Sequence, residues 1–166
     1  HTPYMDRIAA QGTLGLLDTI PDGFTPGSDV ANLSVLGYDP RECYTGRGAI
    51  EAANMGVSLG PSDVAFRCNL VTLSDDASPV MEDFTAGHIS TKEAGWIIRD
   101  LGEALSDGQG DFFAGVSYRH LYVRRNGNEA MRTTPPHDIV GQPIDRYVPA
   151  GKGAGAILEI ADRARG

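Results

Sequence analysis

The stretch that decides the fold class runs from residue 90 to residue 125 and reads STKEAGWIIRDLGEALSDGQGDFFAGVSYRHLYVRR. Its first four residues, Ser90 to Glu93, form a capping box, which satisfies free amide groups at the start of a helix. Apolar residues then recur at helical spacing and predict one buried helix face, made of Ala94, Ile97, Ile98, Leu101 and Leu105. The run from 112 to 125 is rich in aromatic and β-branched residues and predicts a strand.

Two neighbouring segments extend this pattern into a sheet. Residues 64–73 alternate like a strand, with Phe66 and Cys68 on one face and Arg67 and Asn69 on the other. The pair Asn126-Gly127 is a two-residue hairpin signal and predicts a turn into a further strand. Intermixed helices and strands predict an α/β (α+β) fold, with a small mixed sheet covered by helices on one side.

Further helices are predicted near both ends of the chain. Thr2-Pro3 opens the first, which stops at Gly12, and a helix over 154–165 is followed by Gly166 as its cap. A chain that begins on a capping residue without a starting Met is expected to be a piece of a larger protein. A short helix from Ser28 stops at Gly37 and is expected to bury Val30, Leu33 and Leu36. Residues 133–143 hold three prolines and predict a loop.

Composition excludes several classes of protein. The 166 residues are 41% hydrophobic and 22% charged, which excludes a disordered tail and a coiled coil. No apolar run reaches the length of a membrane-spanning helix, which is roughly 18–20 residues. A net charge of −8 disfavours nucleic acid and anionic membranes as partners. Cys43 and Cys68 lack metal-ligand spacing and are expected to be buried free thiols in the cytoplasm.

The turn Pro26-Gly27-Ser28-Asp29 is the most informative local motif. A helix start presents free amides and a partial positive charge that suit an anion. Ser28 could cap the helix, bind an anion or act as a nucleophile, and spacing alone favours the cap. Because no His or Lys lies near Ser28 in the sequence, a nucleophilic Ser28 would need an activating group from elsewhere.

Arginine makes up 12 of the 14 basic residues, and its guanidinium forms bidentate pairs with carboxylates and phosphates. A G+C-rich genome would also produce this bias. Charged residues inside strands either face water or line a pocket, and the pattern alone favours water. The candidate ligands for a small anion are Arg47 in a Gly-Arg-Gly turn, Arg67 and Asn69 on one strand face, Arg119 and His120 in a second strand, and His137 in a proline-rich loop. The sequence around His137 is equally typical of a surface turn with no ligand.

Several blocks of the chain together resemble the archaeal-type cofactor-independent phosphoglycerate mutases, of the alkaline phosphatase superfamily. The resemblance covers essentially the whole chain. The blocks are 2–9 (TPxMDRIA, with Tyr4 where the family often has Asn), 26–40 (PGSDVANLSVLGYDP), 44–52 (YTGRGAIEA), 63–69 (DVAFRCN), 86–90 (AGHIS) and 118–121 (YRHL). His88 stands where many relatives carry Arg, so its contact with substrate stays open.

The resemblance implies a metal-dependent phosphatase domain interrupted by an inserted domain that grips the substrate. Residues 1–45 would be a segment of the phosphatase domain, and residues 46–150 would form the inserted domain. Residues 151–166 would be a helix that returns to the phosphatase domain. Ser28 would be the nucleophile and a metal ligand, carrying the phosphoryl group between 3-phosphoglycerate and 2-phosphoglycerate. Arg47, Arg67, Asn69, Arg119, His120 and His137 would hold the substrate.

The resemblance also implies two divalent metal ions (Mn, Mg, Co or Zn) and no requirement for 2,3-bisphosphoglycerate. The other metal ligands would lie outside this sequence, so this piece alone is expected to be inactive and to need the remainder of its own chain. Two alternatives stay open. One is another phosphohydrolase or phosphomutase of the superfamily, acting on a different phosphorylated small acid or sugar, and the other is a non-catalytic binding module.

Overall fold

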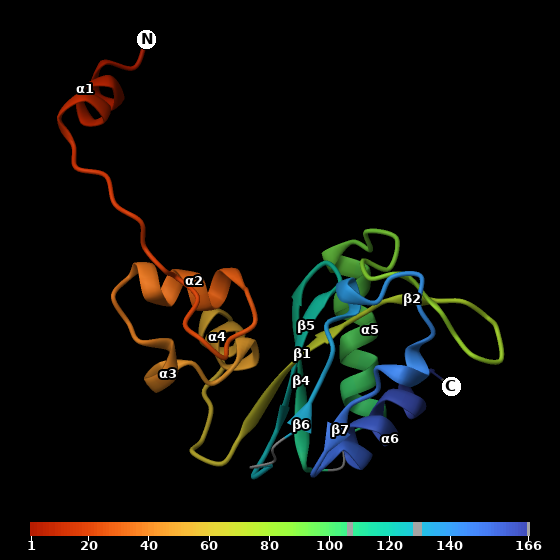
Figure 1. The fold of residues 1–166 in the computed structure, drawn as a ribbon. Coiled ribbons are helices and arrows are strands. Elements are labelled where there is room, and N and C mark those ends of the chain that lie inside the picture. Colours follow the sequence, from red (N-terminus) through yellow and green to blue (C-terminus); the bar gives the residue numbers. More distant parts are fainter. Residues whose placement is uncertain (106–107, 128–130, 166) are drawn as a thin grey trace. The chain divides into compact units, whose positions relative to one another are not determined.

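The computed structural model describes residues 1–105, 108–127 and 131–165, and it divides the chain into two compact units, 1–45 and 46–166 (Figure 1). The predicted Gly166 cap lies outside the described residues.

The first unit consists of three helices joined by turns. They are α1 (Pro3–Gln11), α2 (Ser28–Val35) and α3 (Pro40–Cys43). The expected start and end of α1 are confirmed, with Thr2 and Gly12 as caps, although α1 buries no residue. In α2 only Val30 is fully buried, and the predicted burial of Leu36 is wrong because Leu36 caps the helix end and is 72% exposed.

The second unit is built on a three-stranded sheet with the order β1-β5-β4. Its strands are β1 (Val64–Asn69), β4 (Gly110–Val116) and β5 (Arg119–Arg124), and all pairings are antiparallel. Two short ladders join β2 (Thr72–Leu73) to β3 (Met81–Asp83) and β6 (Met131–Arg132) to β7 (Ala150–Gly151). The remaining elements are α4 (Arg47–Asn54), α5 (Thr91–Ala104), η1 (Pro136–Asp138), η2 (Ile144–Arg146) and α6 (Ala154–Arg165).

Helices α4 and α5 cover opposite faces of the sheet (Figure 1). Ala52 of α4 clusters with Leu121 and Val123, whereas Gly102 of α5 lies against Phe112, the register partner of Tyr122. Side chains 121 and 123 point away from side chain 122 because strand residues alternate between faces. The α/β (α+β) class is therefore confirmed, but the described sheet is antiparallel instead of mixed, and helices cover both faces instead of one.

The capping box and most of the helix behind it are confirmed. The Ser90 hydroxyl accepts a hydrogen bond from the Glu93 amide at 3.2 Å, and Ala94, Ile98 and Leu105 are buried. Ile97 departs from the prediction, since 42% of it is exposed. At about 100° per residue, Ile97 lies at the margin of the buried stripe that Ala94, Ile98 and Leu105 define.

The predicted single strand over 112–125 is two strands, because the chain reverses at Ser117-Tyr118. Ser117 adopts a φ of 54°, its hydroxyl donates to the Ile89 carbonyl at 2.7 Å, and its amide donates to the Thr91 hydroxyl at 3.1 Å. These two bonds hold a reversal that contains neither glycine nor asparagine, which is why the sequence pattern did not indicate it.

The predicted hairpin at Asn126-Gly127 is wrong for the described residues. Strand β6 pairs with β7, and the Asn126 amide instead donates to the Asp63 carboxylate at 3.1 Å. Similarly, the predicted strand 64–73 ends at Asn69, and its last two residues form β2, which pairs with β3.

Both cysteines are free, as expected, but they differ in burial. Cys43 is exposed on α3, so its predicted burial is wrong. Cys68 is half-buried on the sheet, where desolvation raises the pKa of its thiol to about 11. Cys68 is consequently a neutral thiol at physiological pH.

Gly48 is expected to control how closely α4 approaches the sheet. A Cβ atom at this position would lie 1.9 Å from the Ala65 carbonyl oxygen, so Gly48→Ala forces the helix away from β1. We expect a loss of roughly 1–3 kcal/mol in the free energy of unfolding, measured by urea denaturation of the 166-residue chain. Gly95→Ala on α5, where no atom lies within 4 Å of the added Cβ, is the control. Equal stability of the two variants would contradict the close approach.

Candidate functional site

Three of the predicted ligands lie on one face of the sheet. Asn69 is the register partner of Arg119, and Arg67 is the register partner of Leu121. Because residues two apart share a face, Arg67, Asn69 and Arg119 project from the face that carries Leu121 and Val123. We call Arg67, Asn69 and Arg119 the basic face.

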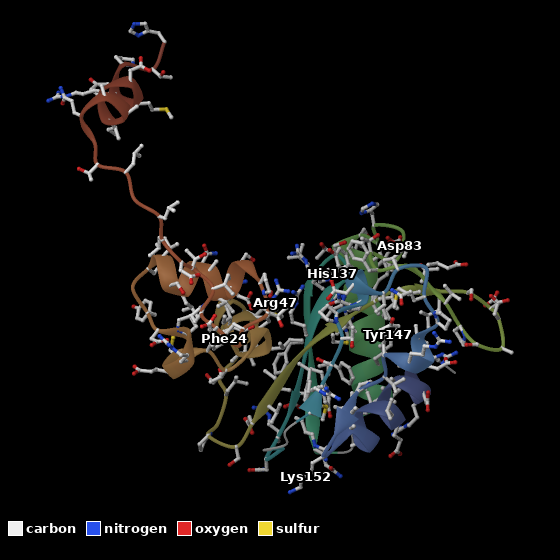
Figure 2. The ribbon with its side chains drawn as sticks, in the orientation of Figure 1. Phe24, Arg47, Asp83, His137, Tyr147 and Lys152 are labelled. Carbon is white, nitrogen blue, oxygen red and sulfur yellow. The ribbon has the colours of Figure 1, made fainter. Side chains whose placement is uncertain are left out.

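Helix α4 packs on the same side of the sheet and begins at Arg47. The close approach of Gly48 to the Ala65 carbonyl brings the first turn of α4 against β1, just before Arg67. Arg47, labelled in Figure 2, therefore starts the helix that borders the basic face. The fold thus brings together α4, β1 and β5, the three elements that carry Arg47, Arg67 and Arg119.

The arginines of the basic face differ from the structural arginines in their partners. Arg41 pairs with Asp39 at 3.0 Å, and Arg125 pairs with Asp63 at 2.7 Å and with Asp111 at 2.9 Å. Arg67 and Arg119, in contrast, have no carboxylate partner among the residues that the structure describes. In a chain with a net charge of −8, these two guanidiniums remain available to an anionic ligand.

Asn69 adds a buried hydrogen-bond acceptor to this face. Its Oδ1 atom is shielded from solvent and has no hydrogen-bond partner within the described part of the chain. A buried polar atom without a partner destabilises a protein by about 1–3 kcal/mol. A ligand that donates a hydrogen bond to Asn69 would recover that free energy.

His137 is connected to the turn before Arg119 through two aromatic side chains. It is exposed on η1, its Nε2 is 3.4 Å from the Asp138 carboxylate, and its ring centroid is 6.0 Å from that of Phe84 (Figure 2). The Phe84 ring in turn contacts Tyr118, which directly precedes Arg119. A series of aromatic contacts therefore connects His137 with the turn before Arg119.

The structure does not bring His120 to the basic face. His120 follows Arg119 along β5, so its side chain points to the opposite side of the sheet, where it is 1% exposed. Its Nδ1 accepts a hydrogen bond from the Gly115 amide at 3.1 Å, and its Nε2 has no partner among the described residues. Desolvation lowers the pKa of His120, which favours the neutral ring.

This burial predicts a pH dependence of stability. The unfolded chain binds a proton at His120 near its ordinary pKa of about 6.5, whereas the folded chain binds it only at lower pH. The free energy of unfolding should therefore fall as the pH drops below about 6.5. Urea denaturation should show a weaker pH dependence in His120→Gln than in wild type, and His88→Gln, which changes an exposed histidine, is the control. An unchanged dependence in His120→Gln would contradict a buried neutral histidine.

Ser28 belongs to the first unit and is the first residue of α2. The expectation that it caps the helix is wrong, because Gly27 occupies the cap position with extended backbone (φ −162°, ψ 147°) and no side chain makes a cap hydrogen bond. The Ser28 side chain is exposed, and its hydroxyl bonds no described residue. The neighbouring carboxylate of Asp29 accepts a hydrogen bond from the Tyr44 hydroxyl.

Among the described residues, no group of three or more His, Cys, Asp and Glu side chains could hold a metal ion. Ser28 alone therefore does not make a metal centre in this part of the chain. Within the same residues, no helix is both long and apolar enough to cross a lipid bilayer.

A face with two guanidiniums that lack carboxylate partners among the described residues suits a small anionic ligand. Comparison with known proteins identifies the family. The profile described as 2,3-bisphosphoglycerate-independent phosphoglycerate mutase matches residues 9–166, and the chain belongs to this family. The resemblance inferred from the sequence blocks is thereby confirmed.

Individual relatives agree with this assignment. The chain is 52% identical to a probable 2,3-bisphosphoglycerate-independent phosphoglycerate mutase of Geobacter sulfurreducens, over 96% of this chain and 40% of that protein. It is 50% identical to the 2,3-bisphosphoglycerate-independent phosphoglycerate mutase of Methanosarcina mazei, over 99% of this chain and 41% of that protein. The chain thus spans about two fifths of the length of the curated relatives it matches.

A solved structure of a Pyrococcus horikoshii protein has a similar fold. The TM-score is 0.59 at 30% sequence identity, and the match covers 77% of this chain and 31% of that one.

Proposed function

We propose that this chain is part of a cytoplasmic enzyme that interconverts 3-phosphoglycerate and 2-phosphoglycerate without 2,3-bisphosphoglycerate. Membership in the mutase family supports the reaction. The observation that carries the substrate side of the proposal is the basic face, where Arg67 and Arg119 lack carboxylate partners among the described residues. A phosphoglycerate offers both a carboxylate and a phosphate to such groups.

Ser28 is the proposed nucleophile. Its exposed hydroxyl lies at the start of α2, where free backbone amides and the helix dipole favour a phosphate. In the first step the Ser28 hydroxyl loses its proton, a bond forms between its Oγ and phosphorus, the bond between phosphorus and the C3 oxygen breaks, and that oxygen takes up a proton. In the second step the C2 hydroxyl loses its proton and attacks the phosphoserine, the bond between phosphorus and Ser28 Oγ breaks, and Oγ takes up a proton. This sequence gives the isomer without net hydrolysis.

Two divalent cations of the Mn, Mg, Co or Zn class would activate the Ser28 hydroxyl and offset charge on the phosphoryl group. Ser28 is the only ligand that we assign to them in this chain. The described residues hold no cluster of further ligands, so we propose that those ligands lie in the remaining three fifths of the protein. In this proposal residues 1–45 and 151–166 belong to the phosphatase domain and residues 46–150 form the insertion.

The arginines hold the glycerate while the phosphoryl group rests on Ser28. Free glycerate must stay bound and turn before the second step, so its carboxylate needs a contact independent of phosphate. The bidentate guanidinium groups of Arg67 and Arg119 provide that kind of contact, and we assign Arg47 and His137 to the same ligand. His120 has no such role in this account, because it lies on the opposite face.

Asn69 is expected to recognise the free hydroxyl of the substrate. That hydroxyl would donate to the buried Oδ1 atom, so Asn69→Leu should raise the KM for 3-phosphoglycerate about tenfold in the full-length enzyme. Inhibition by 3-phosphonooxypropanoate, which lacks this hydroxyl, should change much less. An equal loss for both compounds would contradict the hydroxyl contact.

Product analysis tests the proposed reaction directly. Phosphorus NMR of the full-length enzyme with 3-phosphoglycerate should show 2-phosphoglycerate at equilibrium and little inorganic phosphate. Inorganic phosphate as the main product would instead indicate a phosphohydrolase, and no conversion in the presence of divalent metal would indicate a binding module.

A further inference from the structure

Arg119 rests on an aromatic support that no motif in the sequence indicated. The carbon of its guanidinium lies 5.6 Å from the ring centroid of Tyr118, within the range of a cation–π contact. The Tyr118 ring also makes a T-shaped contact with the Phe84 ring, at a centroid distance of 5.9 Å and an interplanar angle of 81°. From this stack we infer that Tyr118 is a positioning residue for Arg119, an inference that rests on the proposed function of Arg119 as a substrate ligand.

The turn before Arg119 is fixed more firmly than an ordinary surface turn. Ser117 has a φ of 54° and is held by two hydrogen bonds, to the Ile89 carbonyl and from its amide to the Thr91 hydroxyl. Such a backbone conformation is strained and persists only where the surroundings determine it. The peptide that carries Tyr118 and Arg119 is therefore anchored to the N-terminal end of α5.

The loop that carries Phe84 is fixed in a comparable way. The Asp83 carboxylate accepts hydrogen bonds from the Thr85 amide at 2.8 Å and from the Gly87 amide at 2.7 Å, and hydrogen bonds from Thr85 and Gly87 lower the pKa of Asp83. Three consecutive residues of this loop have positive φ angles, Ala86 (49°), Gly87 (65°) and His88 (56°). Phe84 thus contacts Tyr118 from a second rigid segment, far from it in the sequence.

The ring of Tyr118, rather than its hydroxyl, makes these contacts. No hydrogen bond of the Tyr118 hydroxyl to another described residue is present, and the side chain lies outside the buried core cluster of Ala52, Leu121 and Val123. An exposed arginine otherwise samples many rotamers, and ordering it on binding costs free energy. A guanidinium already stacked on Tyr118 avoids part of that cost, which strengthens ligand binding.

The test uses steady-state kinetics of the full-length enzyme with 3-phosphoglycerate. Tyr118→Leu and Tyr118→Met, which both remove the ring, should raise KM about three- to fivefold with little change in kcat. Tyr118→Phe should keep the wild-type KM. In an Arg119→Ala background, Tyr118→Leu or Tyr118→Met should cause no further rise, because the ring acts through Arg119. Trp96→Leu removes the ring beneath Lys92 on α5, 5.1 Å away, and is the matched control.

Different results would contradict the positioning role of Tyr118 and the proposed substrate contact of Arg119. A wild-type KM in both Tyr118→Leu and Tyr118→Met, alongside a clear loss in Arg119→Ala, overturns the positioning role alone. An equal rise in KM with and without Arg119, or a Tyr118→Phe variant as impaired as Tyr118→Met, also overturns it. A wild-type KM in Arg119→Ala overturns the substrate contact itself, and the inference falls with it.

Discussion

Full-length enzyme carrying Ser28→Ala is expected to fold normally and to lose mutase turnover by roughly 10⁴-fold or more. The loss follows because no other group in the proposed mechanism accepts the phosphoryl group. The free energy of unfolding should change by no more than about 0.5 kcal/mol, as for other surface substitutions. The Ser28 side chain is exposed, and Gly27, not Ser28, caps α2. The rate of 2-phosphoglycerate formation tests the loss of turnover, and thermal denaturation of the same variant tests the unchanged stability.

Ser34→Ala is the matched control on the same helix. Its hydroxyl donates to the Val30 carbonyl at 3.3 Å, within the helix, and plays no part in the proposed chemistry. Wild-type turnover is expected for Ser34→Ala. A folded Ser28→Ala enzyme with near-normal turnover would remove Ser28 from the mechanism, whatever the family assignment.

The second large effect is expected at the basic face. Arg67→Ala and Arg119→Ala should each lower kcat/KM about ten- to a hundredfold, because each removes a charge-assisted contact worth roughly 1.5–3 kcal/mol. The melting temperature should change little, since neither guanidinium pairs with a carboxylate in the described part of the chain. Lysine at either position should restore only part of the activity, because it keeps the charge without the planar fork.

Arg99→Ala is a suitable control for these variants. Arg99 is exposed on α5, which covers the opposite face of the sheet, so its loss should leave kcat/KM unchanged. Wild-type kcat/KM in both Arg67→Ala and Arg119→Ala would show that these arginines are solvated surface groups.

Sequence patterns correctly predicted those helices and strands that are determined by residues close together in the sequence. The helix over 91–104 follows from the hydroxyl of Ser90 and the spacing of Ala94 and Ile98, all within one segment. The turn at Ser117 could not be predicted in this way, because the Ile89 carbonyl and the Thr91 hydroxyl that hold it lie 28 and 26 residues away. Asn126 shows the converse: a strong local hairpin signal fails because β5 already pairs with β1 on one side and β4 on the other.

The candidate site shows the same division between local and long-range causes. Strand alternation alone placed Arg67 and Asn69 on one face, and this is confirmed by the register of β1. Alternation also separates Arg119 from His120, but the sequence did not show which of the two shares a face with Arg67, since that depends on strand pairing. The contact of Phe84 with Tyr118 joins segments that are distant in the sequence and leaves no spacing pattern.

The central claim is that the phosphoryl group passes through Ser28, and trapping the intermediate tests it most directly. Full-length enzyme would be mixed with 3-phosphoglycerate labelled in its phosphate, quenched in acid within a turnover, and digested for mass spectrometry of the peptides. The account predicts label on the peptide that contains Ser28, as phosphoserine, and none in Ser28→Ala. Label on a different residue, or turnover with no labelled peptide, would contradict it.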